Sequence, residues 1–142
     1  MRVLFDTNVV LDVLLAREPH AATAARLFAL VDTGKLEGSV CASTVTTVHY
    51  LAAKAIGDRT ARRLLREFLD LFDLAPVDRL VLETALRLDF TDYEDAVVHE
   101  AARACGAAGI VTRNTKDFAR ATLPVFSPDE LLSALVAAES AA

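Results

Sequence analysis

The chain has 142 residues, of which 54% are hydrophobic and 25% charged, which excludes a disordered chain and predicts one globular domain over residues 1–142. Its two cysteines form no Cys-x-x-Cys pair, so neither a disulfide scaffold nor a structural zinc site is indicated, and a reducing, cytoplasmic location fits best. The net charge of −5 argues against a protein that holds nucleic acid through a generally basic surface, but it suits carboxylates that surround a divalent cation.

The first half of the chain alternates short apolar runs with helix signals. Residues 3–5 are apolar and stop at the polar segment 6–8, after which apolar residues recur at helical spacing, so a strand and then a helix are expected. The apolar run 9–16 is too short to cross a membrane, and no signal peptide is evident, so we expect an unexported protein without a membrane segment. The next expected elements are a helix over 21–31, a strand over 38–42, a helix from 43 to 55 and a helix over 60–72.

The second half continues the alternation. Its expected elements are an extended piece over 74–77 that contains a proline, a helix from 79 to 88, a helix over 93–105, a strand over 109–112, a strand over 123–126 and a terminal helix from Pro128. Strands that alternate with helices predict an α/β fold with right-handed crossovers. We therefore expect a three-layer α/β/α domain with a mostly parallel central sheet of about four to five strands.

Carboxylates stand where predicted strands end or helices begin. Asp6 follows the first strand, Asp92 and Asp95 open a helix, and Asp117 follows the strand over 109–112. Parallel strands present their carboxyl ends at one edge of a sheet, so these acids could converge there. Each acid alone is better explained as a helix cap or a turn residue, but their joint placement suits Mg²⁺ or Mn²⁺, which take oxygen ligands. If they converge, at least one of their pKa values should be raised when no metal is bound.

Three segments together carry a family resemblance: DTN at residues 6–8, DYEDA at residues 92–96 and VTRNTKDF at residues 111–118. They resemble the signature segments of the PIN-domain family of metal-dependent ribonucleases, which includes the VapC-type toxins of bacterial toxin–antitoxin pairs. The order and spacing of the segments are similar over nearly the whole chain. The resemblance implies a PIN-like fold, an RNA substrate, Mg²⁺ or Mn²⁺ as cofactor, a homodimer and a cognate antitoxin.

The resemblance also implies roles for single residues. Asp6, Asp95 and Asp117 resemble the catalytic, metal-coordinating acids, and Asp92 resembles an accessory metal-binding acid. The polar residues expected to orient these acids or to contact substrate are Asn8, Thr112 and Asn114, and the basic residues expected to contact phosphate are Arg113 and Lys116. A stripe of arginines at 59, 62, 63 and 66 is more simply a solvated helix face.

One position departs from the family pattern. The family usually carries a glutamate on the helix after the second strand, and we match that position to His49. Histidine can bind Mn²⁺ but is a poor Mg²⁺ ligand, and His49 is equally well explained as a half-buried helix residue. The alternative function is therefore a catalytically weakened or inactive PIN-like protein that binds RNA or another protein.

Two further hypotheses concern the helix over 93–105 and the role of Asp6. On the helix over 93–105 we expect His99 to be structural or solvent-exposed rather than a ligand, and Glu94 and Glu100 to be solvated on other faces of the helix. A phosphatase with Asp6 as nucleophile is a remote alternative, because such enzymes generally need a second aspartate two residues later, where this chain has Asn8.

Overall fold

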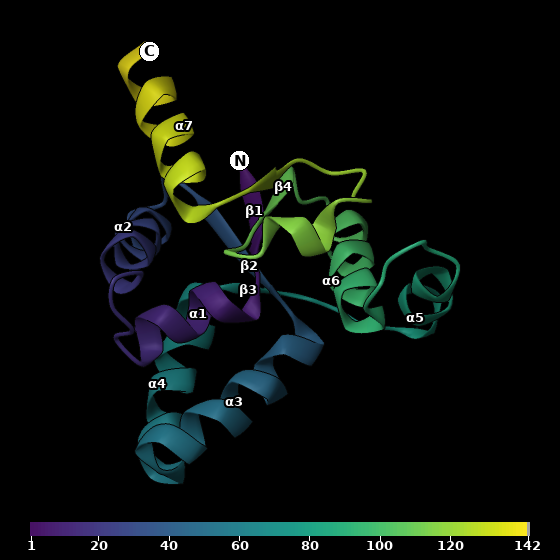
Figure 1. The fold of residues 1–142 in the computed structure, drawn as a ribbon. Coiled ribbons are helices and arrows are strands. Elements are labelled where there is room, and N and C mark those ends of the chain that lie inside the picture. Colours follow the sequence, from purple (N-terminus) through teal and green to yellow (C-terminus); the bar gives the residue numbers. More distant parts are fainter. Residues whose placement is uncertain (142) are drawn as a thin grey trace.

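Five parallel strands form the central sheet of the computed structural model, which describes residues 1–141 (Figure 1). The strand order is β3-β2-β1-β4-β5, and all pairings are parallel. The strands are β1 (Arg2–Phe5), β2 (Glu37–Cys41), β3 (Asp73–Ala75), β4 (Gly109–Val111) and β5 (Val125–Phe126). The helices are α1 (Thr7–Leu14), α2 (Ala21–Asp32), α3 (Ala42–Ile56), α4 (Asp58–Leu71), α5 (Arg79–Leu86), α6 (Tyr93–Ala104) and α7 (Pro128–Ala141), with a single 3-10 turn, η1 (Thr115–Phe118).

The central strands β1, β2 and β4 are buried on both faces, and their side chains divide the core in two. Along β1, Val3 and Phe5 join one apolar cluster and Leu4 joins the other, as expected for side chains that alternate across a strand. The first cluster is completed by α1, α2, α3, α4 and α7, and the second by α5 and α6 (Figure 1). The predicted three-layer α/β/α architecture is confirmed.

A group of phenylalanines fixes α4 against the sheet. The ring of Phe72, at the end of α4, lies 4.9 Å from that of Phe5 and 4.4 Å from that of Phe68, measured between ring centroids. Gly38 makes room for this packing, since a Cβ atom there would lie 2.5 Å from the Phe72 ring. The small residue on β2 thus lets an aromatic ring lie directly on the strand backbone.

The direction of the connections reverses at β1. The chain runs from β1 through β2 to β3 by way of α1 to α4, and then crosses by α5 and α6 to β4, on the other side of β1. The register pairs Phe5 with Val111, so the residues that follow these two strands emerge side by side. Open parallel sheets place ligands outside the carboxyl ends of strands at such a point.

The observed elements differ from the prediction mainly at their ends. β2 stops at Cys41, and Ala42 already begins α3, so strand and helix join directly. The extended piece expected over 74–77 is the edge strand β3, which ends at Ala75 because Pro76 follows it. Throughout residues 1–141, every helix is too short or too polar to cross a membrane.

Candidate active site

Asp6 is the buried acid at the end of β1. It caps α1, and its Oδ1 atom accepts a hydrogen bond from the Thr7 amide at 2.8 Å. Its Oδ2 atom accepts a bond from Thr112 Oγ1 at 2.8 Å, across the gap between β1 and β4. Burial raises the pKa of Asp6, the bonds from Thr112 and Thr7 oppose that rise, and Asp117 adds to it. The side chain is therefore held in one orientation at the edge of the sheet.

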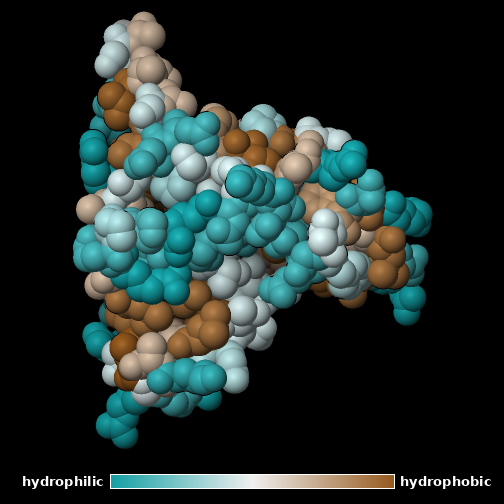
Figure 2. All heavy atoms as spheres, viewed as in Figure 1, coloured by the Kyte–Doolittle hydropathy of each residue, from teal (hydrophilic) through white to brown (hydrophobic). Residues whose placement is uncertain are grey.

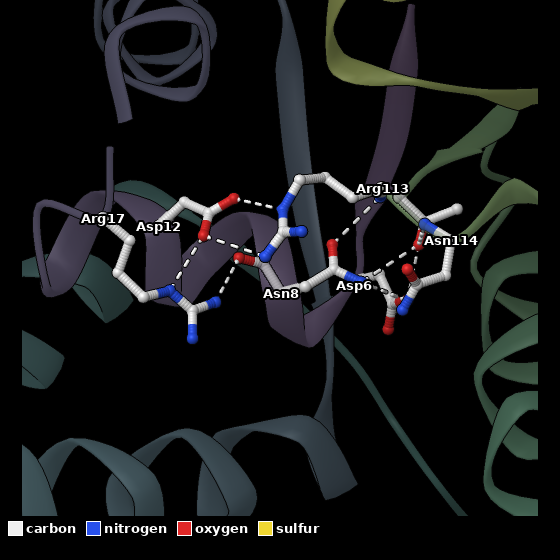
Figure 3. Close-up of polar contacts among 7 residues, drawn as sticks. Asp6, Asn8, Asp12, Arg17, Arg113 and Asn114 are labelled. Carbon is white, nitrogen blue, oxygen red and sulfur yellow. Dashed lines mark hydrogen bonds and ion pairs between the residues drawn. The ribbon is translucent and has the colours of Figure 1, made fainter. Parts of the chain in front are cut away.

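Asn8 and Thr112 tie the two strand ends together. Asn8 accepts a hydrogen bond from the Arg113 amide at 3.1 Å and donates one to Thr112 Oγ1 at 3.3 Å. The same hydroxyl accepts a bond from the Asn114 amide at 3.0 Å while it donates to Asp6. Figure 3 shows this chain of contacts between the loop after β4 and the start of α1. With both acceptor positions filled, the Thr112 hydroxyl proton is directed at Asp6.

Asp95 is the acid most affected by its surroundings. Asp92 caps α6, accepting a bond from the Asp95 amide at 3.2 Å, which places both carboxylates at the first turn of the helix. Half-burial, followed by the negative charges of Asp6, Asp92 and Asp117, raises the pKa of Asp95 to about 7. The direction agrees with the expectation for converging acids, with burial as the larger cause.

The acids meet in one cavity of about 360 Å³. In the space-filling view, the surface is hollowed between the lobe formed by α3 and α4 and the lobe formed by α5 and α6 (Figure 2). The predicted residues that line the cavity are Asp6, Asn8, Asp92, Asp95, Arg113, Asn114 and Asp117. Lys116 lies instead in an adjoining cavity of about 460 Å³, which shares Asp92, Asp95 and Asp117. Residues from three regions of the chain are therefore brought to one place.

His49 is not among the residues that line this cavity. Its Nε2 atom lies 2.8 Å from Asp58 Oδ1, between α3 and α4. The residues that α3 presents to the cavity are Thr47 and Leu51, one helical turn apart, whereas residue 49 is rotated by about 200° from residue 47. The match of the family glutamate to His49 stays a prediction; in the structure, the α3 side chains that line the cavity are Thr47 and Leu51.

The sequence prediction missed the roles of Asp12 and Arg17, and it gave no part in the site to Glu94, which also lines the cavity. Asp12 is completely buried on α1, and it receives Arg113 Nε at 2.7 Å, Arg113 Nη2 at 3.2 Å and Arg17 Nε at 2.9 Å (Figure 3). Arg17 also donates to the Asn8 carbonyl at 3.2 Å and lines the cavity. A signal was available, because a single carboxylate in the apolar run 9–16 requires a partner if that helix is buried.

Among the other polar residues of α6, Glu94 lines the cavity, whereas His99 and Glu100 do not. His99 is buried, with Nδ1 at 3.0 Å from Glu100 Oε2, and its Nε2 atom accepts a bond from the Thr122 amide at 3.0 Å. Glu100 was expected to be solvated, but it is buried, because it pairs with His99 and lies 3.6 Å from Arg103. The structural interpretation of His99 agrees with these contacts.

The donor set suits a hard divalent cation in type and in charge. Asp6, Asp92, Asp95 and Asp117 offer carboxylate oxygens, and within residues 1–141 no basic side chain forms an ion pair with any of them. The same part of the chain contains no group of three or more His, Cys, Asp or Glu side chains already close enough to share a metal ion. The acids therefore fit Mg²⁺ or Mn²⁺ chemically, without forming a closed cage beforehand.

Comparison with known proteins supplies the family. A family model described as a PIN domain matches residues 2–116. The chain belongs to the PIN-domain family. The match ends one residue before Asp117, so this cavity-lining acid lies outside the matched residues. A comparison with curated proteins gave no significant match.

Solved structures resemble this PIN domain over most of its length. A toxin–antitoxin complex from Klebsiella pneumoniae is 26% identical, with a TM-score of 0.66 over 89% of this chain and 97% of that chain. DNA-bound VapBC from Salmonella typhimurium is 15% identical, with a TM-score of 0.70 over 90% and 98%. VapC20 from Mycobacterium tuberculosis, described as a Sarcin-Ricin loop cleaving toxin, is 18% identical, with a TM-score of 0.62 over 76% and 86%.

Proposed function

We propose that this PIN-domain protein is a metal-dependent endoribonuclease and the toxin of a toxin–antitoxin pair. One observation carries the nuclease proposal: Asp6, Asp95 and Asp117 come from three elements, line one cavity and have no basic partner there. Burial, and then the negative charges of Asp6, Asp92 and Asp117, raise the pKa of Asp95 to about 7, a shift of the kind that clusters at functional sites. Such a site favours a divalent cation and, through it, a phosphate group.

The proposed roles follow from the contacts. Asp6, Asp95 and Asp117 would hold the cation, and Asp92 would support it from the start of α6. A bound Mg²⁺ or Mn²⁺ would polarise the scissile phosphate and lower the pKa of the attacking water. Thr112 and Asn8 keep Asp6 in one orientation. The loop after β4 supplies the remaining candidates for substrate contact, which are Arg113, Asn114 and Lys116.

The toxin part of the proposal rests on similarity. The structures that this chain resembles include toxin–antitoxin complexes from Klebsiella pneumoniae and Salmonella typhimurium. By analogy, the partners we propose are an RNA substrate, a cognate antitoxin and a second copy of the chain. Co-expression with the product of an adjacent small gene, followed by purification, tests the antitoxin: a stable complex without ribonuclease activity is expected.

A second candidate function is an RNA-binding or protein-binding PIN domain with little catalytic power. It is favoured by Thr47, which stands where α3 meets the cavity and supplies no carboxylate. It is also favoured by the lack of a preformed group of three metal-binding side chains within residues 1–141. This candidate predicts RNA binding without cleavage.

Cleavage of a labelled single-stranded RNA separates the two candidates. We expect cleavage with Mg²⁺ or Mn²⁺, none with EDTA, and a loss of at least about 100-fold in Asp6→Asn and Asp117→Asn. Asp78→Asn is the matched control, because Asp78 caps α5 as Asp6 caps α1 but lies outside the cavity. Equal cleavage by Asp6→Asn and the unchanged protein would refute the nuclease proposal.

A further inference from the structure

The acidic and the basic side chains occupy different sides of the cavity. The acids Asp6, Asp95 and Asp117 lie toward α6 and η1, whereas Arg17 and Arg113 are drawn together around Asp12 on α1. Figure 3 shows the two arginines directed at Asp12 on one side of Asn8, with Asp6 on the other side. Both arginines nevertheless line the same cavity as the acids.

Asp12 compensates only one of the two positive charges. Its side chain has no exposed surface, whereas those of Arg17 and Arg113 are 39% and 29% exposed. Two guanidinium groups around one carboxylate leave one surplus positive charge. Because Asp12 is completely buried and both arginines are partly exposed, the surplus positive charge lies on the side that faces the cavity.

Each guanidinium also retains hydrogen-bonding capacity. Arg17 uses Nε for Asp12 and Nη2 for the Asn8 carbonyl, and Arg113 uses Nε and Nη2 for Asp12. These bonds leave the Nη1 group of each arginine available. A guanidinium fixed at two nitrogens loses little conformational entropy when the third binds a ligand.

Asp12 also keeps the arginines from neutralising the acids. A long basic side chain beside a group of carboxylates would ordinarily pair with them, yet in the part of the chain that the structure describes Arg17 and Arg113 form ion pairs only with Asp12. The acids remain open to a cation, and the arginines remain open to an anion. A phosphodiester strand with a divalent cation satisfies both halves of such a cavity.

We propose that Arg17, acting with Arg113 and positioned by Asp12, binds a backbone phosphate of the RNA strand next to the phosphate at the acids. The inference rests on the proposed ribonuclease function and adds a substrate-binding residue to it. Guanidinium groups bind phosphate oxygens through short, charge-assisted hydrogen bonds. The contact carries no base preference, because it reads the backbone alone.

Arg17→Gln tests the inference, with Arg2→Gln as a matched control. Arg2 has a similar side-chain exposure of 34% and pairs with Glu37, but it lies at the opposite, amino end of β1. In Arg17→Gln, Asp12 retains both bonds from Arg113, so the fold should persist, which thermal unfolding verifies. Arg17→Lys restores the positive charge without the planar guanidinium group, so it should recover part of the lost RNA affinity.

Two readouts are combined. For cleavage, Arg17→Gln should raise KM about tenfold while kcat stays within about threefold, as expected for a lost contact to the strand. For binding, anisotropy of a short labelled single-stranded RNA is measured at several salt concentrations in the Asp117→Asn background. The slope of log affinity against log salt should fall by about 0.7 for Arg17→Gln and stay unchanged for Arg2→Gln.

The outcomes distinguish the two proposals. If the unchanged protein cleaves RNA but Arg17→Gln has the same KM and salt slope as Arg2→Gln, the proposed phosphate contact is refuted. The ribonuclease proposal is then supported. If the unchanged protein binds RNA with a salt slope that depends on Arg17 but does not cleave it, the proposed phosphate contact is supported. The ribonuclease proposal is then refuted. Absence of both binding and cleavage overturns both proposals.

Discussion

Thr112 Oγ1 donates a 2.8 Å hydrogen bond to Asp6 Oδ2, joining residues that are 106 positions apart in the sequence. The bond spans the carboxyl ends of β1 and β4, which pair in parallel. Both groups are buried, so neither can exchange its partner for water at low cost. This contact sets the direction of the Asp6 carboxylate and makes Thr112 the first residue to test.

We expect Thr112→Val to lower RNA cleavage at least about tenfold and to destabilise the fold by about 1–2 kcal/mol, because Asp6 loses a buried donor. Loss of that donor also raises the pKa of Asp6 further, so the acid limb of the pH–activity profile should shift to higher pH. Thr44→Val is the matched control: the Thr44 hydroxyl is buried and has no hydrogen-bond partner within residues 1–141. Chemical denaturation and initial rates measure both effects, and equal losses in the two variants would contradict the assignment.

Asp95→Asn should stabilise the metal-free protein. Because the folded pKa of about 7 exceeds the ordinary value of 3.8, the wild-type contribution is favourable at low pH and is lost as pH rises toward 7. At pH 8 the amide should be more stable by about 1–2 kcal/mol, a figure reduced for solvent screening. The exposed pair of Asp89 with Arg120 makes Asp89→Asn a neutral control.

With divalent cations present, the stability advantage of Asp95→Asn over the wild type should be reversed. Mn²⁺ should raise the midpoint of thermal unfolding of the wild type and much less that of Asp95→Asn, because ligand binding to the folded state alone adds stability. An equal rise in both proteins would show that Asp95 is not a ligand.

Thr47→Glu should raise the affinity of the cavity for a divalent cation. The side chain lines the cavity from α3, so a glutamate there would add a carboxylate to Asp6, Asp95 and Asp117. We expect Mn²⁺ affinity to rise about tenfold, measured by calorimetry, with a faster cleavage rate. His49→Glu is the matched control, because it places the same side chain toward Asp58. A gain in His49→Glu and none in Thr47→Glu would support the match of the family glutamate to position 49.

The buried His99 should make the fold sensitive to acid. Burial lowers its pKa, in opposition to Glu100, so the folded protein holds the neutral ring while the unfolded chain takes up a proton near pH 6.5. Its contribution to stability is therefore present above about pH 6.5 and is lost as pH falls below it. His99→Gln should be less stable at pH 7.5 but should lose less stability between pH 7.5 and about 5.5, whereas the exposed His20→Gln should follow the wild type.

The sequence by itself determined the local features of this protein. An apolar strand followed by a cap residue is a short-range pattern, so the end of β1 at Asp6 and the start of α6 after Asp92 were predictable. The rule that parallel strands present their carboxyl ends at one edge then brought the acids of distant segments together in the prediction. The polar loop after β4 was placed for the same reason, although its 3-10 turn at Thr115–Phe118 was not foreseen.

Only the tertiary structure decided which side chains face the cavity. The rotation of α3 depends on its packing against α1 and α4, and a shift of two residues exchanges Thr47 for His49. The partners of Asp12 are one residue in the next loop and one residue 101 positions away, and no local pattern specifies such a pair. The raised pKa of Asp95 likewise arises from its burial and from the charges of Asp6, Asp92 and Asp117, which become neighbours only when the sheet forms.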